Sequence, residues 1–251
     1  MKTLLMKLNL NLCHFKLKSY LVAIAALLVA SSITANASSE VHVLGEMRRM
    51  FMAHDIGANV EVAKVNQHPH LYALGPVEGL KGEIVVVDGQ VFVSQVKGNA
   101  ARVILDPEVK SVFLVYASVP AWRQVEIPSS VTTEKDLATF LESKIPAQSR
   151  TAFLVHAKAR HARYHIQNFQ GVAKDLTHEA HDKAKVFYEL SDTPVELIGF
   201  FTNREEDGGS FVHQGQSTHT HLISDDHKLM GHLESIVLAP GATLFLPDVK
   251  N

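Results

Sequence analysis

Cysteine is almost absent from this 251-residue chain. The single cysteine, Cys13, precedes the apolar run of residues 20–30, whereas the cysteine of a lipoprotein would follow such a run. Cys13 also lies within a segment that we expect to be removed, so the mature chain would contain no cysteine at all. Neither disulfide bonds nor thiolate chemistry would then be available to the mature protein.

The first 37 residues predict a secretory signal peptide. Four lysines before residue 19 precede an apolar run that is too short to span a membrane comfortably. The small residues Ala35 and Ala37 then form a cleavage site of the Ala-x-Ala type. We therefore expect cleavage after Ala37, export to the periplasm or the medium, and a single domain over residues 38–251. An uncleaved anchor helix is the alternative interpretation.

The chain also lacks an excess of positive charge and a second long apolar run. Without the four lysines of the leader, 20 basic residues face 26 acidic ones. A chain with this acidic balance and no RNA- or DNA-binding motif is not expected to bind nucleic acid. No other segment approaches the length of a membrane span, so no membrane association is expected after cleavage.

Runs of β-branched and aromatic residues are abundant, and they favour strands over helices. The clearest case is a hairpin in which residues 83–87 and 90–93 flank Asp88-Gly89, a strong two-residue turn. Further strands are predicted over residues 102–105, 112–119, 153–159, 162–169, 186–190 and 196–202. The pattern predicts an α+β fold with a mainly antiparallel or mixed β-sheet and few short helices.

Helical patterns are few. Residues 132–145 carry apolar side chains at helical spacing and begin with a cap-like pair, Thr133 and Asp136. Residues 46–54 form a second, short candidate. The polar segment 172–185 is expected to include one helical turn.

The segment from Ser217 to His232 holds the most informative pattern. Side chains alternate along a strand, so His219 and His221 point the same way. A Ser-Asp-Asp stretch at 224–226 supplies a turn, and a returning strand brings His232 beside them. Three imidazole ligands with an open fourth position are typical of a catalytic zinc site. We therefore predict that these three histidines bind Zn²⁺ or another divalent metal. The alternative is a polar strand face that is rich in histidine.

Other histidine patterns are weaker. The pair that flanks Pro69 is expected to mark the entry of a strand, because proline cannot donate to a strand ladder. The run 177–181 has its histidines three residues apart instead of the four that a metalloprotease helix needs, so it is expected to be a solvated helix face. His156, His161 and His165 are expected at the surface or rim, although one could line a cleft.

Two carboxylates have more than one interpretation. Glu83 begins the most apolar strand, directly after Gly82, and is either exposed at the end of a sheet or held in a site. The residue pattern alone favours exposure. Glu234 shares the face of His232 if that segment is a strand. It could be a fourth metal ligand, a partner of a ligand, or a residue that faces solvent.

Three blocks of the sequence resemble the α-acetolactate decarboxylase family. The family pattern Gly-x-His-x-His-Phe-x-Ser-Asp-Asp, then Gly-Gly-His-Val, stands here as residues 217–226 and 230–233, with the spacing of all three histidines. A second block over residues 73–92 matches without gaps. A third block, residues 199–202, reads Gly-Phe-Phe-Thr before the histidine pair. The blocks stand in family order, and the resemblance extends to Leu246.

The resemblance implies roles that the residue pattern does not. Glu83 falls on the family's active-site glutamate. The family arginine falls on Asn168, which cannot form an ion pair with a carboxylate. Arg160 and Arg163 are nearby cations that could replace it with a shifted geometry. The family's C-terminal tail carries a further active-site glutamate, which has no counterpart after Pro247, so we expect that glutamate to be missing.

The resemblance implies a zinc-dependent decarboxylase that converts 2-acetolactate to acetoin and carbon dioxide. Glu83 would be the catalytic acid, and Asn168 would occupy the doubtful arginine position. The expected partner is a small-molecule hydroxy or keto acid, and a homodimer remains an alternative to a monomer. Two other hypotheses stay open. One is a non-catalytic relative that keeps the metal site and binds a small hydroxy acid or a partner. The other is a cupin-like metal protein, suggested by the run 239–243 after the histidine pair.

Overall fold

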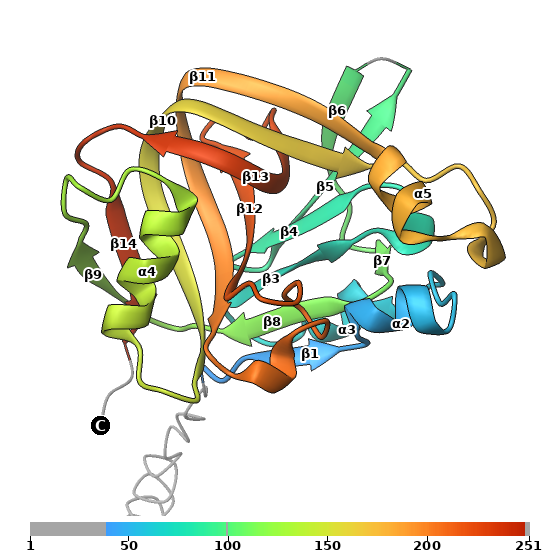
Figure 1. The fold of residues 1–251 in the computed structure, drawn as a ribbon, viewed down its shortest axis with the longest axis horizontal. Coiled ribbons are helices and arrows are strands. Elements are labelled where there is room, and N and C mark those ends of the chain that lie inside the picture. Colours follow the sequence, from blue (N-terminus) through green and yellow to red (C-terminus); the bar gives the residue numbers. More distant parts are fainter. Residues whose placement is uncertain (1–38, 99, 249–251) are drawn as a thin grey trace, which may run out of the picture. The chain divides into compact units, whose positions relative to one another are not determined.

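The computed structural model describes residues 39–98 and 100–248. They form two six-stranded antiparallel sheets and one two-stranded sheet (Figure 1). The α+β class with mainly antiparallel strands and few helices is therefore confirmed. The predicted signal peptide lies outside the described residues. Within the described ranges, no helix is both long enough and apolar enough to cross a membrane.

The first sheet has a nearly continuous apolar interior. In β3 and β4 nearly every residue is buried, which is why these strands lie at the centre of the sheet. The predicted hairpin is present: Asp88 and Gly89 both have positive φ, as a two-residue hairpin turn requires. The strands in sheet order are β1 (His42–Leu44), β8 (Leu114–Ser118), β3 (Leu71–Pro76), β4 (Glu83–Val87), β5 (Gln90–Lys97) and β6 (Ala100–Leu105). Two short strands, β2 (Val60–Glu61) and β7 (Lys110–Ser111), pair separately.

The second sheet is built around two long strands. They pair with each other over nearly their whole length, and this extra pairing closes β10, β11, β12 and β13 into a ring. Inside the ring, apolar side chains such as Phe153, Tyr164 and Leu222 form a core. The strands in sheet order are β11 (Lys185–Thr202), β12 (Thr218–Ser224), β13 (Met230–Leu238), β10 (Arg150–Gln167), β14 (Thr243–Pro247) and β9 (Trp122–Glu126).

The prediction of four separate strands in this region was wrong. Residues 153–159 and 162–169 belong largely to the single strand β10, and residues 186–190 and 196–202 belong to β11. The predicted strands stopped at residue 190 and resumed at residue 196, because the run Ser191-Asp192-Thr193-Pro194 is typical of a turn. In the structure Asp192 adopts a positive φ and a register irregularity follows Ala159, so a local distortion absorbs the turn residues while the strands continue.

A second core joins the two sheets. It combines residues of the first sheet, such as Leu74 and Val115, with residues of the second, such as Leu154 and Phe200. This packing matters for function because it brings the beginning of β4 against the end of β10 and against β12 and β13.

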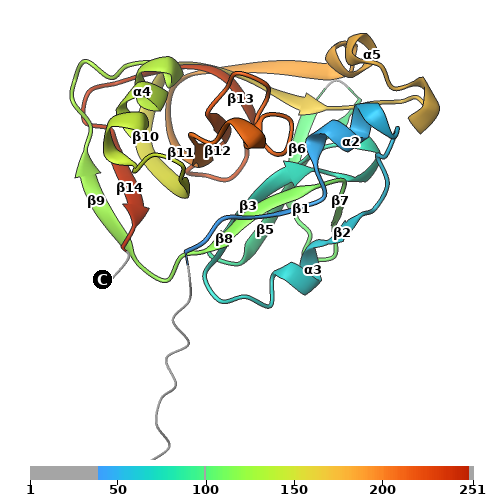
Figure 2. The same ribbon diagram turned by 60° about the horizontal axis from the view of Figure 1, so that its bottom comes forward.

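The helices are short and lie at the edges of the sheets. The helix predicted over 132–145 is α4 (Glu134–Lys144), and Thr133 and Asp136 form its capping box. The other α-helices are α2 (Met47–Met52), α3 (Val62–Val65) and α5 (His178–Lys183). Single 3-10 turns occur at 78–80, 173–175 and 205–207. Helices α2 and α5 lie close together in Figures 1 and 2, and the rings of Phe51 and His178 stack at 3.9 Å.

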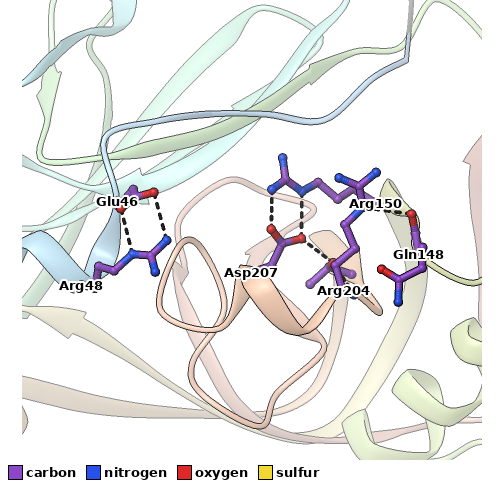
Figure 3. A network of polar contacts seen from close by, with 7 residues as sticks. Glu46, Arg48, Gln148, Arg150, Arg204 and Asp207 are labelled. Atoms are coloured by element: carbon purple, nitrogen blue, oxygen red, sulfur yellow. Dashed lines mark hydrogen bonds and ion pairs between the residues drawn. The ribbon is translucent and has the colours of Figure 1, made fainter.

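A polar network anchors the β10–β11 pair at the end where β10 begins. Arg150 donates two hydrogen bonds to the buried carboxylate of Asp207, which also accepts one from Thr202 (Figure 3). Arg204 donates to the carbonyl of Gln148 at 2.9 Å. Each buried charge of this network has a partner, as a structural ion pair requires.

Candidate metal centre and active site

Three histidine rings meet on the β12–β13 hairpin. His221 lies directly opposite His232 in the strand register, and His219 shares the face of His221. The centroids of the three rings are 4.9–5.2 Å apart, and one nitrogen from each ring lies within 4.8 Å of the others. The predicted hairpin and the convergence of the rings are both present. This group could therefore hold a metal ion.

The surroundings of these rings fit a cation. His221 is fully buried, and neither of its ring nitrogens has a hydrogen-bond partner. Nδ1 of His219 is likewise buried without a partner. Burial lowers the pKa of His219 to about 3 and holds the pKa values of His221 and His232 well below the ordinary range. The imidazoles are therefore neutral and have free lone pairs, the form in which histidine binds metals.

Glu83 lies beside the three rings at the first position of β4. Its Oε2 is 3.8 Å from Nε2 of His221, and its Oε1 accepts a hydrogen bond of 3.0 Å from the backbone N–H of Gln167. The side chain is almost fully buried, so the exposure that the residue pattern favoured is wrong. Burial raises the pKa of Glu83 to about 8. The carboxyl group therefore carries a proton at neutral pH.

Gly82 places this carboxyl group. Its φ of +147° is disfavoured for residues with a side chain, and a Cβ at this position would lie 2.4 Å from the carbonyl oxygen of Ser94. Glycine lets β4 enter the sheet tightly against β5. The close approach fixes the position of Glu83 at the start of β4.

A fourth histidine completes the site. His165 on β10 lies opposite His232, and its Nδ1 forms a 2.7 Å hydrogen bond with Glu234. If Nδ1–H donates to the carboxylate, Nε2 faces Glu83, whose Oε1 is 3.9 Å away. Glu234 is therefore a partner of His165, which answers the question that its position in the sequence left open. Of the three histidines expected at the surface or rim, His165 is instead buried and lines this cavity, while His156 is exposed.

The cavity that holds these groups has one polar wall and one apolar wall. Glu83, His165, His219 and His232 lie on the polar wall. The apolar wall comes from α2, the end of β3 and the segments that precede β4, β8 and β12, with Met47, Met50, Pro76, Leu80, Phe113, Phe211 and Val212. Such a cavity suits a small ligand with methyl groups on one side and oxygen atoms on the other.

Comparison with known proteins decides the family. The family model for alpha-acetolactate decarboxylase matches residues 49–245. The chain belongs to this family. An alpha-acetolactate decarboxylase of Streptococcus thermophilus is 24% identical over 193 residues, which cover 76% of this chain and 77% of that protein.

Solved structures show the same fold. The alpha-acetolactate decarboxylase of Bacillus subtilis strain 168 superposes with a TM-score of 0.68 at 13% identity, covering 84% of this chain and 86% of that chain. The acetolactate decarboxylase of Bacillus subtilis subspecies spizizenii gives a TM-score of 0.69 at 16% identity, covering 85% and 88%. The acetolactate decarboxylase fold, together with membership of the family, sets aside the cupin-like alternative.

Asn168, which the resemblance led us to expect at the position of the family arginine, does not line the cavity. Its side-chain oxygen accepts a 2.7 Å hydrogen bond from Gln170, and its backbone N–H donates to the carbonyl of Ala184. The two nearby arginines do not replace it. Arg160 is exposed, and the guanidinium of Arg163 stacks on the ring of Phe187 at 3.8 Å.

Sequence reasoning missed two further groups of the site. His178 is exposed as expected of a solvated helix face, but His181 is buried, and its Nε2 is 2.8 Å from Nε2 of Gln167. The hydrogen-bonded pair therefore extends the polar wall, and burial lowers the pKa of His181 to about 4. Lys185, the first residue of β11, also lines the cavity. No local pattern marks either residue, because their positions depend on the register of β10 against β11.

Glu134 is a further, partly buried acid near the site. Burial, with a smaller contribution from the charge of Glu234, raises the pKa of Glu134 to about 7. With Thr218 and Glu234 it lines a second hollow that shares His232 with the metal cavity. In the sequence Glu134 is visible only as the first residue of a capped helix.

Proposed function

We propose that this protein is a zinc-dependent decarboxylase that converts 2-acetolactate to acetoin and carbon dioxide. The observation that supports the proposal best is the meeting of three neutral imidazoles and a buried, protonated Glu83 in one cavity of the family fold. An imidazole triad with an open coordination position is the donor set of catalytic zinc.

His219, His221 and His232 would hold the metal ion. When bound there, a divalent cation supplies Lewis acidity toward the hydroxyl and carbonyl oxygens of an α-hydroxy ketone. The remaining roles belong to side chains. Glu234 holds the ring of His165 at its Nδ1, and an oriented ring keeps the polar wall preorganised.

Glu83 is the proton donor in this proposal. Decarboxylation breaks the bond between the carboxylate carbon and the hydroxyl-bearing carbon, and the electron pair stays on the latter. A proton from Glu83 then forms the new C–H bond of acetoin, and Glu83 is left ionised until it regains a proton. A carboxyl group whose pKa is raised to about 8 holds this proton at neutral pH, as a general acid must.

The apolar wall fits the two methyl groups of this substrate. Met47, Met50 and Phe113 line the same cavity as the polar groups and limit the water that can reach Glu83. Exclusion of water also strengthens the electrostatic interactions within the cavity.

A non-catalytic relative is the second candidate function. Its support is the position of Asn168, which hydrogen-bonds to Gln170 and leaves the family arginine without a counterpart at that place. Such a protein would keep the metal site and bind a hydroxy acid without turnover. The predicted signal peptide further leads us to propose that the protein acts outside the cytoplasm, after removal of residues 1–37.

Turnover of the purified protein tests the proposal directly. Metal content is measured by mass spectrometry, and racemic 2-acetolactate is added while acetoin and carbon dioxide are quantified. We expect about one zinc ion per chain and equal amounts of the two products. Bound zinc without any acetoin would favour the non-catalytic relative, and protein that takes up no divalent metal would contradict both candidates.

A further inference from the structure

The cavity contains a single side chain with a permanent positive charge. Among the described residues that line it, Lys185 is the only lysine or arginine. The same side chain also lines the two neighbouring hollows, so it stands at the boundary between them and the cavity. Only 17% of the side chain is exposed.

The strand register fixes this position. Lys185 begins β11 and pairs with Gln167, the last residue of β10. The backbone N–H of Gln167 in turn donates to Glu83. The lysine and the buried acid are therefore both attached to the same pair of strand ends. The charge of Lys185 acts on the acid, because it lowers the pKa of Glu83 against the larger, opposite effect of burial.

The ammonium group has unused hydrogen-bonding capacity. Its ion pairs among the described residues are with Asp182 at 3.3 Å and Glu234 at 3.7 Å, and both distances are longer than those of strong N–H···O hydrogen bonds. Asp182 is 67% exposed, so solvent weakens its pull on the lysine. Glu234 already accepts the closer hydrogen bond from His165. An ammonium group with three donors can therefore turn toward an anion in the cavity.

We propose that Lys185 binds the carboxylate of the substrate, the role for which Asn168, Arg160 and Arg163 are wrongly placed. The inference rests on the proposed function and names the group that recognises the acid. Without the lysine, the carboxylate would be desolvated near the carboxylate of Glu234 with no side-chain cation beside it. Acetoin lacks the carboxylate, so the same lysine favours the substrate over the product.

The contact has a defined kinetic signature. The ammonium–carboxylate interaction exists in the ground state and is lost as the carboxylate becomes neutral carbon dioxide. Removing it should therefore raise KM without lowering kcat, because an interaction that is lost on the way to the transition state does not stabilise that state. A hydrogen bond between charged groups corresponds to about a 10- to 100-fold change in affinity.

Binding measurements test the lysine without relying on turnover. The probes are 2-hydroxy-2-methylpropanoate, which carries the carboxylate, and acetoin, which does not. Calorimetry on the zinc-loaded protein should show that Lys185→Met weakens binding of the hydroxy acid about 10- to 100-fold and leaves the affinity for acetoin unchanged. Lys185→Arg should restore most of the affinity. Lys183→Met is the matched control, because that exposed lysine pairs with Glu179 on α5. This variant should bind the hydroxy acid with the affinity of the wild type.

Each outcome decides between the proposals. Equal affinity of the wild type and Lys185→Met for the hydroxy acid, or no binding to the wild type, overturns the assignment of Lys185. If Lys185→Met loses as much affinity for acetoin as for the hydroxy acid, the assignment is overturned too, because the substitution then distorts the whole cavity. Lysine-dependent binding without any turnover of acetolactate keeps the assignment and rejects the decarboxylase.

Discussion

The two ends of the β10–β11 pair treat polar groups in opposite ways. Where β10 begins, Arg150 and Asp207 satisfy each other, and Thr202 adds a further hydrogen bond (Figure 3). Where β10 ends, side-chain atoms of Gln167, His219 and His221 are buried without partners. The first end holds loops together, and the second keeps its atoms available for a ligand. The comparison teaches that burial of polar groups alone does not identify a site, whereas several unpartnered polar atoms gathered beside one cavity do.

Removing a ring from the unsatisfied end should have the largest effect on activity and little effect on the fold. We expect His221→Leu to lose bound zinc. Loss of a residue that only supports a metal ligand lowers activity by up to about 100-fold, and loss of the ligand itself should lower turnover further. The metal-free variant should be at least as stable as the metal-free wild type, because a buried group without partners disappears. Metal analysis and urea denaturation measure the two effects. The exposed His156→Leu serves as control, and a strongly destabilised His221→Leu would break the comparison.

Replacing Glu83, which lies at the same unsatisfied end, should affect turnover alone. Glu83→Gln keeps the size of the side chain and removes the transferable proton, so we expect kcat to fall about 10²- to 10⁴-fold with zinc content unchanged. Steady-state formation of acetoin provides the measurement. Glu126→Gln on β9, an exposed residue, should behave as the wild type. Undiminished turnover in Glu83→Gln would remove this residue from the mechanism.

Breaking the satisfied end should affect stability alone. Arg150→Met leaves the carboxylate of Asp207 with 1% exposure and without its cation. We expect the free energy of unfolding to fall by about 3 kcal/mol, as for other buried pairs that lose one partner. Urea denaturation measures this loss, while zinc content per folded chain should remain that of the wild type. A variant that loses zinc but keeps its stability would show that the two ends are not separate.

The pH dependence of stability offers the finest comparison. Burial acts to raise the pKa of Asp207, but the hydrogen bonds from Arg150 and Thr202 outweigh it and leave the pKa below its ordinary value of 3.8. Stabilisation from this group is therefore fully present above that ordinary value, and it is lost as the pH falls through the lower pKa of the folded state. Asp207→Asn should flatten this acid-side decline in urea denaturation between about pH 5 and pH 2. An unchanged slope would show that Asp207 does not contribute to it.

The sequence predicted the parts of the site that are local in the chain. His219, His221 and His232 belong to one hairpin, and the two-residue period of a strand together with a short turn is enough to bring them together. The family resemblance was needed for Glu83, since its own surroundings in the sequence suggested an exposed strand end. The capped helix α4 was also predicted, because its capping box is a local signal.

The groups at the end of β10 could not be predicted, because they depend on long-range register. His165, Gln167 and Lys185 meet only if β10 and β11 each run unbroken for 18 residues. The predicted strands 186–190 and 196–202 left a break before and at Pro194. With two separate strands in place of β11, the pairing of Lys185 with the end of β10 is undefined. A one-residue shift would turn His165 to the opposite face.

The apolar wall of the cavity has a consequence for altering substrate size. Met47 and Met50 belong to a short helix far along the chain from the histidine hairpin and Glu83, and their unbranched side chains adjust to neighbours of different shape. Exchanges at these two positions can widen or narrow the space for alkyl groups without touching the groups proposed to bind metal or move protons. A library restricted to α2 would therefore explore longer 2-hydroxy-3-keto acids while the chemistry stays constant.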